Sequence, residues 1–301
     1  MEETWTDLGS AFAALSNWNR WGDADELGTL NLLTDDYVHR CFSESVVDGH
    51  RVSLSRPLKT EAQIAGNGYM HHMLSSGDEA PAQGFGSTAD WFGLGFHGFE
   101  YTHIDSPAHI IWDGKLYNGH DAETCTTSRG AQRCAVDAAS EGILTRALFI
   151  DGPRIKGKDH LAPDDAITAS ELDTWCTEKQ LTPQPGDSLV IRFGRDRMGG
   201  IDPASLPGMA IDTLRWIKER DCSLIVSDII SDQTPSVTDD CRLPFHVLTI
   251  AAMGMWLIDN ASLGPAATVC EDRGRWSFLL LVAPLVLGRA TGSPVNPVAI
   301  F

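Results

Sequence analysis

Residues 102–109 combine the side chains that most often bind metal ions and move protons. The stretch reads Thr-His-Ile-Asp-Ser-Pro-Ala-His, so His103, Asp105 and His109 fall within seven residues. In an extended segment alternate side chains share a face, which predicts that His103 and Asp105 lie together. Imidazole and carboxylate are common ligands of Zn²⁺, Mn²⁺ and Fe²⁺. His109 follows a proline and could carry a proton in the same cavity if the chain turns there.

A second half of this site is expected far downstream. His246 opens a predicted helix over 246–255, and Asp259 begins the segment after that helix. Both side chains could then face the cavity that contains His103 and Asp105. Taken alone, this pair also fits a simpler interpretation: a histidine at the start of a helix and an Asp-Asn turn. That structural role is the more common one for such residues.

The elements that must position these residues alternate between strands and helices. Strands are predicted at 51–58, 147–151, 188–193, 224–228 and 278–286, and helices at 34–42, 168–176, 207–220 and 246–255. Residues 168–171 form a capping-box pattern, Thr-Ala-Ser-Glu. Residues 60–90 are rich in Gly, Ser and Ala and predict a long loop or flap. Interleaved helices and strands indicate an α/β or mixed α+β fold around a sheet.

Composition narrows the class of protein. The chain has 301 residues and a formal charge of −18, which argues against nucleic-acid binding. No apolar run is long enough to span a bilayer, and the acidic start lacks the order of a signal peptide, so a cytoplasmic protein with no membrane partner is expected. Seven cysteines without a CxxC pair predict free, partly buried thiols.

Several motifs, in their order along the chain, resemble the cyclase-type metal-dependent hydrolases, the family of bacterial kynurenine formamidase and isatin hydrolase. The resemblance is to the longer members and covers most of the chain. It is carried by residues 19–31, 102–109 with 112–119, 185–187, 207–208, 246–260, 283–285 and 291–297. Each motif is short, and their order is what makes the resemblance specific.

The resemblance implies an α/β fold with a mixed sheet, the swivelling β/β/α cyclase-like fold. It implies one domain over 1–301, with 1–45 as an aromatic N-terminal extension and 60–90 as a flap. It also implies roles for individual residues. His109 would be the general acid/base, the metal ligands would include His103, Asp105, His246 and Asp259, and the substrate would contact Trp18, Trp21, Phe99 and Tyr101.

The chain departs from the family motif His-x-Gly-Thr-His-x-Asp-x-Pro-x-His at its front. Phe99 stands at the position of the first histidine and Tyr101 at that of the glycine. Phenylalanine cannot bind a metal. His97 could substitute if the loop is re-routed, or Glu100 could. Without either, three protein ligands would still leave a workable catalytic site.

Three functions follow as hypotheses. The first is a zinc- or manganese-dependent hydrolase that cleaves an amide, lactam or lactone bond of a small cyclic or aromatic substrate. The second is a metal-free cyclase, lyase or isomerase that uses the same His/Asp cluster for acid/base chemistry. The third is a non-catalytic binding protein on the same fold. A homo-dimer or homo-tetramer is expected from the resemblance.

Overall fold

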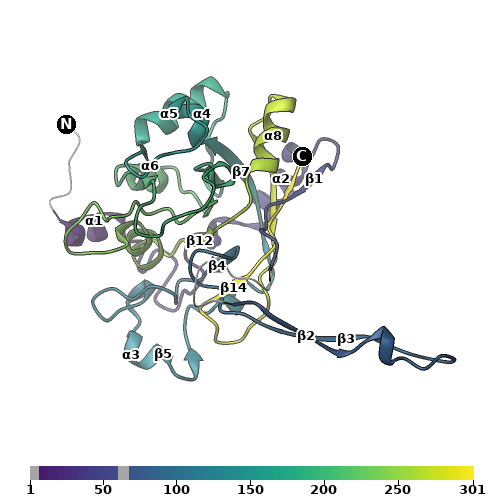
Figure 1. Ribbon diagram of the computed structural model, residues 1–301. Helices are drawn as coiled ribbons and strands as arrows, with labels where there is room; N and C mark the ends of the chain where they lie inside the picture. Colours follow the sequence, from purple (N-terminus) through teal and green to yellow (C-terminus); the bar gives the residue numbers. More distant parts are fainter. Residues whose placement is uncertain (1–6, 60–67) are drawn as a thin grey trace.

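A nine-stranded mixed sheet forms the centre of the molecule in the computed structural model, which describes residues 7–59 and 68–301 (Figure 1). Its strand order is β1-β15-β13-β7-β9-β11-β12-β4-β14. The four central strands β7, β9, β11 and β12 are parallel to one another, and all other pairings in the sheet are antiparallel. This mixed α/β architecture confirms the predicted fold class.

The strands of this sheet are β1 (Arg51–Ser53), β4 (His103–Asp105), β7 (Ile143–Asp151), β9 (Ser188–Arg192), β11 (Leu224–Ser227), β12 (Trp256–Asp259), β13 (Ser277–Val282), β14 (Gly292–Pro294) and β15 (Val298–Ile300). Three further pairs lie outside it: β2 (Met70–Ser75) with β3 (Ala89–Gly93), β5 (Thr126–Thr127) with β6 (Gly130–Ala131), and β8 (Ala166–Ile167) with β10 (Gly208–Met209).

The helices are α1 (Leu8–Leu15), α2 (Asp35–Ser45), α3 (Ala122–Cys125), α4 (Gly152–Lys156), α5 (Ala169–Glu178), α6 (Thr213–Glu219), α7 (Pro244–His246) and α8 (Gly264–Arg273). A π-helical turn, η6 (Val247–Ala252), continues α7. In Figure 1, α5 and α6 lie to the left of β7 and α8 lies to its right. None of the helices described is long and apolar enough to cross a membrane.

Local sequence explains most of these elements. The central strands β9, β11 and β12 are buried along their whole length, as expected for parallel strands covered on both faces. Thr168 and Glu171 form the predicted capping box at the start of α5, and Thr34 caps α2. All seven cysteines are free, as predicted.

Some predicted boundaries are wrong. The strand expected at 51–58 ends at Ser53, and the helix expected at 207–220 covers only Thr213–Glu219, after the short strand β10. The strand expected at 278–286 covers Ser277–Val282. The helix expected at 246–255 is the short α7 followed by η6. The ends of these strands and helices depend on packing against neighbouring elements, and a local sequence pattern carries no information about that packing.

The segment predicted as a loop or flap contains a β-hairpin. Residues 60–67 lie outside the described residues, but β2 and β3 pair antiparallel with His71 opposite Phe92. We call residues 69–93 the arm. Figure 1 shows the arm extending away from the body of the molecule. The period-two pattern of its strands was hidden by the Gly- and Ser-rich residues that join them.

The register of β4 places the first half of the candidate site. β4 lies between β12 and β14, and His103 is directly opposite Asp259 on β12. Directly opposed residues of an antiparallel pair point to the same face, as do alternate residues of one strand. His103, Asp105 and Asp259 therefore share one face of the sheet. Asp259 ends β12 rather than beginning the segment after a helix, which corrects the sequence prediction.

A close glycine contact follows η6 and holds the N-terminal segment against it. Gly254 has a φ of 66°, and a Cβ there would lie 2.5 Å from the ring of Tyr117. The carbonyl of Gly254 accepts a hydrogen bond from the Thr29 N–H at 3.0 Å. Only glycine combines this left-handed backbone with this close approach.

We therefore expect Gly254→Ala to destabilise the protein by about 1–3 kcal/mol more than Gly274→Ala, because the new methyl overpacks against Tyr117. Gly274 is the matched control, since its φ is 60° and a Cβ there would meet nothing within 4 Å. Urea denaturation of both variants measures the difference. An equal loss of stability in the two variants would show that the close approach to Tyr117 adds nothing to the cost of replacing Gly254.

Candidate active site

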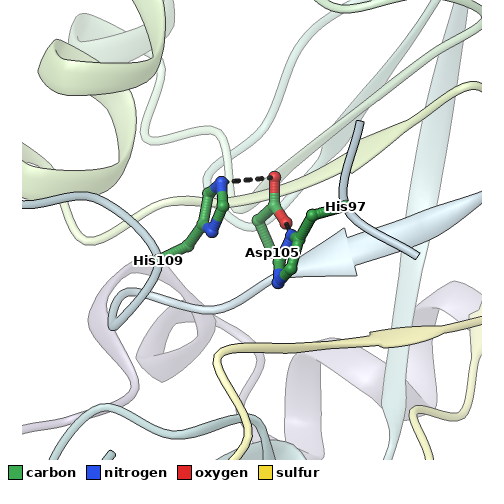
Figure 2. Close-up of side chains that lie close together, drawn as sticks. All are labelled: His97, Asp105 and His109. Carbon is green, nitrogen blue, oxygen red and sulfur yellow. Dashed lines mark ion pairs between the residues drawn. The ribbon is translucent and has the colours of Figure 1, made fainter. Parts of the chain in front are cut away.

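Asp105 is the centre of the candidate site, and three imidazoles surround its carboxylate. Its Oδ1 lies 2.9 Å from Nδ1 of His97 and 3.5 Å from Nε2 of His103. Its Oδ2 lies 3.9 Å from Nε2 of His109. Figure 2 shows His97 and His109 reaching Asp105 from two different segments. The structure therefore brings the motif residues together around one carboxylate.

The downstream half of the site is a histidine held between two carboxylates. Nδ1 of His246 contacts Oδ2 of Asp232, and Nε2 of His246 lies 3.3 Å from Oδ2 of Asp259. Asp232 also accepts hydrogen bonds from the backbone N–H groups of Phe245 and His246, at 2.7 and 3.1 Å. The side chain of His246 is therefore fixed at both ring nitrogens, with Nε2 aimed at the cluster.

Burial divides the site into a closed interior and an open edge. The side chains of His103, Asp105, His246 and Asp259 are each at most 4% exposed, whereas those of His97 and His109 are 31% and 27% exposed. The rings of His97 and His109 stack with centroids 4.1 Å apart and an interplanar angle of 8°. A small molecule arriving from solvent would meet this stacked pair first.

Burial and neighbouring charge shift the titration of three of these groups. Burial would raise the pKa of Asp105, but His103, His109 and His97 outweigh it and hold that pKa below its usual value. Burial lowers the pKa of His109 to about 4, against the attraction of Asp105. His109 is therefore a neutral imidazole at pH 7. Burial also acts to lower the pKa of His246, but Asp232 and Asp259 raise it well above the usual value.

A glycine turn places His97, two residues before Phe99, in contact with Asp105. Gly98 has a φ of 123°, a conformation that favours glycine, so the chain can reverse direction between His97 and Phe99. Nδ2 of Asn260 donates to the Gly98 carbonyl at 2.7 Å, and Nη2 of Arg195 donates to the Phe99 carbonyl at 2.6 Å. Side chains following β12 and β9 thus clamp the re-routed loop. Nε2 of His97 also contacts Oγ1 of Thr291 at 3.1 Å.

The aromatic residues predicted to contact the substrate occupy different places. Trp18 donates from Nε1 to the Ala251 carbonyl of η6 at 2.8 Å and packs against the small apolar cluster of Ala108, Tyr117, Ala131, Cys134 and Ala135. The Trp21 ring lies under the Arg20 guanidinium, 4.7 Å from its centroid. Phe99 is half-buried and packs against the main hydrophobic core.

Tyr101 and Glu100 are both buried. The hydroxyl of Tyr101 accepts from the Tyr69 N–H at 3.0 Å and donates to the Lys59 carbonyl at 3.3 Å. The Tyr101 carbonyl contacts Nδ1 of His103 at 2.8 Å, which orients that imidazole so that Nε2 faces Asp105. Through its carbonyl Tyr101 therefore orients a residue of the cluster, whereas its hydroxyl contacts the base of the arm. Its contact with a substrate, like those of Trp18, Trp21 and Phe99, stays a prediction.

Sequence reasoning missed two residues of the site. Asp232 contacts His246 but is not among the predicted site residues. It follows β11, and a carboxylate beyond the carboxyl end of a parallel strand was the available signal. Phe96 was also missed, although its ring lies 4.5 Å from that of His97 and 6.1 Å from that of His103.

The donor atoms fit a divalent cation. Two groups of potential ligands have all their donor atoms within 4.8 Å of one another: His97, Asp105 and His109, and His103, Asp105 and Asp259. Within the described part of the chain, no hydrogen bond of ordinary geometry reaches the buried Oδ1 of Asp105. A buried carboxylate oxygen that faces imidazole nitrogens is suited to a metal ligand. The imidazole and carboxylate donors are those that Zn²⁺ and Mn²⁺ accept.

The fold is a curled mixed sheet that carries a His/Asp cluster at β4 and β12, and these two features agree with the family to which the sequence belongs. The chain belongs to the cyclase family, whose model matches residues 52–232, more than half of the sequence. The match ends at Asp232, so His246 and Asp259 lie beyond it. No curated protein sequence matches the chain.

Solved structures resemble this one over nearly the whole chain. A crystal structure described as a novel cyclase has a TM-score of 0.86 at 24% identity, covering 96% of this chain and 99% of its own. Isatin hydrolase A from Labrenzia aggregata has a TM-score of 0.59 at 18% identity, covering 88% and 98%. A predicted metal-dependent hydrolase from Bacillus stearothermophilus has a TM-score of 0.53 at 15% identity, covering 84% and 99%. At these identities the likeness establishes the fold.

The contacts of Asp232 predict that Asp232→Asn weakens divalent-metal binding by about 10–100-fold, the usual effect of removing a carboxylate that orients a metal-binding histidine. The amide cannot accept all three hydrogen bonds that the carboxylate now accepts, so His246 loses its fixed orientation. Titration with Co²⁺, followed by visible absorption, measures the affinity.

Asp187→Asn is the matched control for this prediction. Asp187 is equally buried, and its carboxylate accepts hydrogen bonds from the Gln184 N–H, the Tyr37 hydroxyl and the Arg146 guanidinium, none of which belongs to the candidate site. It should reduce the free energy of unfolding and leave Co²⁺ affinity unchanged. Loss of Co²⁺ binding in both variants to the same degree would mean that Asp232 acts only through general stability.

Proposed function

We propose that the protein is a metal-dependent hydrolase that cleaves an amide, lactam or lactone bond of a small cyclic or aromatic molecule. The observation that carries this proposal is the cluster around Asp105, with donor atoms from four segments of the chain at one partly open edge of the sheet. Membership of the cyclase family and the fold shared with proteins named isatin hydrolase support it.

His97, His103, Asp105, His246 and Asp259 are the residues that would hold a divalent ion, zinc or manganese. When bound, such an ion lowers the pKa of a water molecule and polarises a carbonyl group. The chain's own contribution is to orient the donor atoms. Tyr101 directs Nε2 of His103 inward through its carbonyl, and Asp232 does the same for Nε2 of His246.

His109 is placed to move the proton in the proposed reaction. It lies at the open edge, and its Nε2 is 3.9 Å from Oδ2 of Asp105. The neutral imidazole would accept a proton from the attacking water and return it to the leaving nitrogen or oxygen. Asp105 would stabilise the imidazolium formed between these two transfers.

Aromatic side chains favour a flat, apolar substrate. The Phe96 ring lies 4.5 Å from that of His97 and 6.1 Å from that of His103, and Trp18 packs against the apolar cluster that includes Ala108. Apolar surroundings exclude bulk water and strengthen electrostatic effects on the reacting carbonyl. An aryl lactam or an N-acyl aniline combines a flat apolar ring with the carbonyl group that such a reaction requires.

We expect chelation to abolish hydrolysis of such substrates and Zn²⁺ or Mn²⁺ to restore it. Elemental analysis of the purified protein should find a divalent metal, and a substrate panel of amides, lactams and lactones monitored by absorbance supplies the activity. Undiminished activity in a metal-free preparation would reject the metal-dependent mechanism and favour a cyclase, lyase or isomerase that uses acid/base chemistry alone.

The position of His109 predicts that His109→Ala lowers kcat by about 100-fold or more, because the proton carrier is lost. Metal content, measured by elemental analysis, should stay within twofold of the native protein if the other residues suffice as ligands. His39→Ala, an exposed histidine on α2, is the control and should be silent. Full turnover by His109→Ala would remove this residue from the mechanism.

A further inference from the structure

The loop that carries His97 is held by side chains rather than by pairing of its own backbone. Within the described part of the chain, residues 94–101 take part in no backbone–backbone hydrogen bond. The four consecutive carbonyls of residues 98–101 instead accept hydrogen bonds from side chains of distant segments. Buried backbone groups need such partners, so these side chains determine the path of the loop and with it the place of His97.

Asn260 makes two of these contacts and is fully buried. Its Nδ2 donates to the Gly98 carbonyl at 2.7 Å and to the Tyr101 carbonyl at 3.3 Å, while its Oδ1 accepts from Nη1 of Arg195. Its backbone has a φ of 58°, a left-handed conformation that asparagine adopts more readily than most residues. One amide therefore joins both ends of the loop segment 98–101 to Arg195.

Arg195 supplies the contact to the middle of the same segment. Its Nη2 donates to the Phe99 carbonyl at 2.6 Å, and the residue is only 8% exposed. Burial and the neighbouring Arg56 lower the pKa of Arg195 to about 10, so the guanidinium is still a cation at pH 7. A charged donor makes a hydrogen bond roughly twice as strong as a neutral one. The planar guanidinium also reaches the Phe99 carbonyl and the Asn260 amide together.

Three neighbouring strands of the sheet fix these two side chains. Arg195 follows β9, Asp228 follows β11 and Asn260 follows β12. The carboxylate of Asp228 accepts the backbone N–H groups of residues 193–195 at 2.7, 3.0 and 3.0 Å, which ties the turn that presents Arg195 to the next strand. The loop of His97 is therefore bound to the edge of the sheet where these parallel strands end.

The imidazole of His97 occupies a narrow space. Its Nδ1 lies 2.9 Å from Oδ1 of Asp105, and its ring stacks on that of His109 with centroids 4.1 Å apart. A Cβ on Gly292 of β14 would lie 2.9 Å from Cε1 of His97. Because these neighbours belong to other segments, a shift of the loop would take the ring out of contact with Asp105.

We propose that Arg195 and Asn260 are positioning residues that hold His97 beside Asp105, and that Asp228 supports them by fixing the turn that presents Arg195. We call Arg195 and Asn260 the clamp. The placement of His97 is a property of the metal-free protein, whereas the effect of the clamp on metal binding rests on the proposed function. Without the clamp, the loop loses most of its hydrogen bonds and His97 leaves the cluster.

Two variants remove different contacts of the clamp. Arg195→Met removes both donors of the guanidinium. Asn260→Asp keeps an acceptor for Arg195 but has no N–H to donate to the loop carbonyls. Arg195→Lys, which keeps the charge and loses the planar fork, should have an intermediate effect and replaces Arg195→Met if that variant does not fold. Circular dichroism shows whether each variant is folded.

Arg146→Met is the matched control. Arg146 is also partly buried and donates to a carbonyl, that of Thr182 at 2.8 Å, and to the carboxylate of Asp187. None of these contacts belongs to the candidate site. This variant should lose stability and leave His97 in place.

The first measurement is the rate at which diethyl pyrocarbonate modifies His97 in the metal-free protein, followed by peptide mass spectrometry. The side chain is now 31% exposed, so release by either clamp variant should raise this rate by about threefold or more. The rate should stay native in Arg146→Met, with the exposed His39 as the internal reference. An unchanged rate at His97 in the folded clamp variants would overturn the proposal.

Co²⁺ titration tests the consequence for metal binding. Both clamp variants should bind Co²⁺ about 10–100-fold more weakly than the native protein, and Arg146→Met should bind it as the native protein does. Asn260→Asp adds a negative charge beside Asp259, which by itself would attract a cation, so weaker binding by this variant points to the loop.

The two measurements separate the possible failures. Full Co²⁺ affinity in variants whose His97 reacts faster would overturn the link to metal binding and leave the positioning of His97 intact. Absence of Co²⁺ binding by the native protein would contradict the proposed metal function, and the rate of modification at His97 would then decide the role of the clamp.

Discussion

The site depends on the burial of three carboxylates, Asp105, Asp232 and Asp259, each at most 2% exposed. Carboxylates out of water are costly unless hydrogen bonds or positive charge compensate them. Asp232 is compensated by two backbone N–H groups and His246, and Asp259 by His246 and Ser227. Asp105 has only imidazoles around its carboxylate, so a bound cation would stabilise this buried charge more than the other two. The rest of the fold holds the hydrogen-bond donors and imidazoles in place around the three carboxylates.

Each donor comes from an element whose position is fixed by something else. β4 is held between β12 and β14, so His103 and Asp105 cannot move independently of the sheet. η6 follows His246, and Gly254 packs the end of that turn against Tyr117 and the N-terminal segment. π-Helical turns are often found at functional sites, where they re-aim a side chain. The loop that carries His97 is clamped by Asn260 and Arg195.

The sequence predicted the local features well because local rules decide them. Alternation along an extended segment placed His103 and Asp105 on one face, and the capping pattern at Thr168 placed the start of α5. What failed depends on distant partners. The pairing of His103 with Asp259 follows from sheet register, the turn at Gly98 from contacts with Asn260, and the contact of Asp232 with His246 from the path of the chain after β11. Nothing within these segments encodes them.

The pairing of β4 with β12 and β14 also sets the order of events during synthesis. Two strands near the C-terminus enclose a strand from the first half of the chain, so β4 gains both neighbours only when nearly all of the chain is available. Contacts between such distant segments form late, because loop closure costs entropy before the contacts repay it. His103, Asp105 and Asp259 therefore come together only when β12 has paired with β4. A divalent ion of the kind proposed above would find its full set of donors only in the completed molecule.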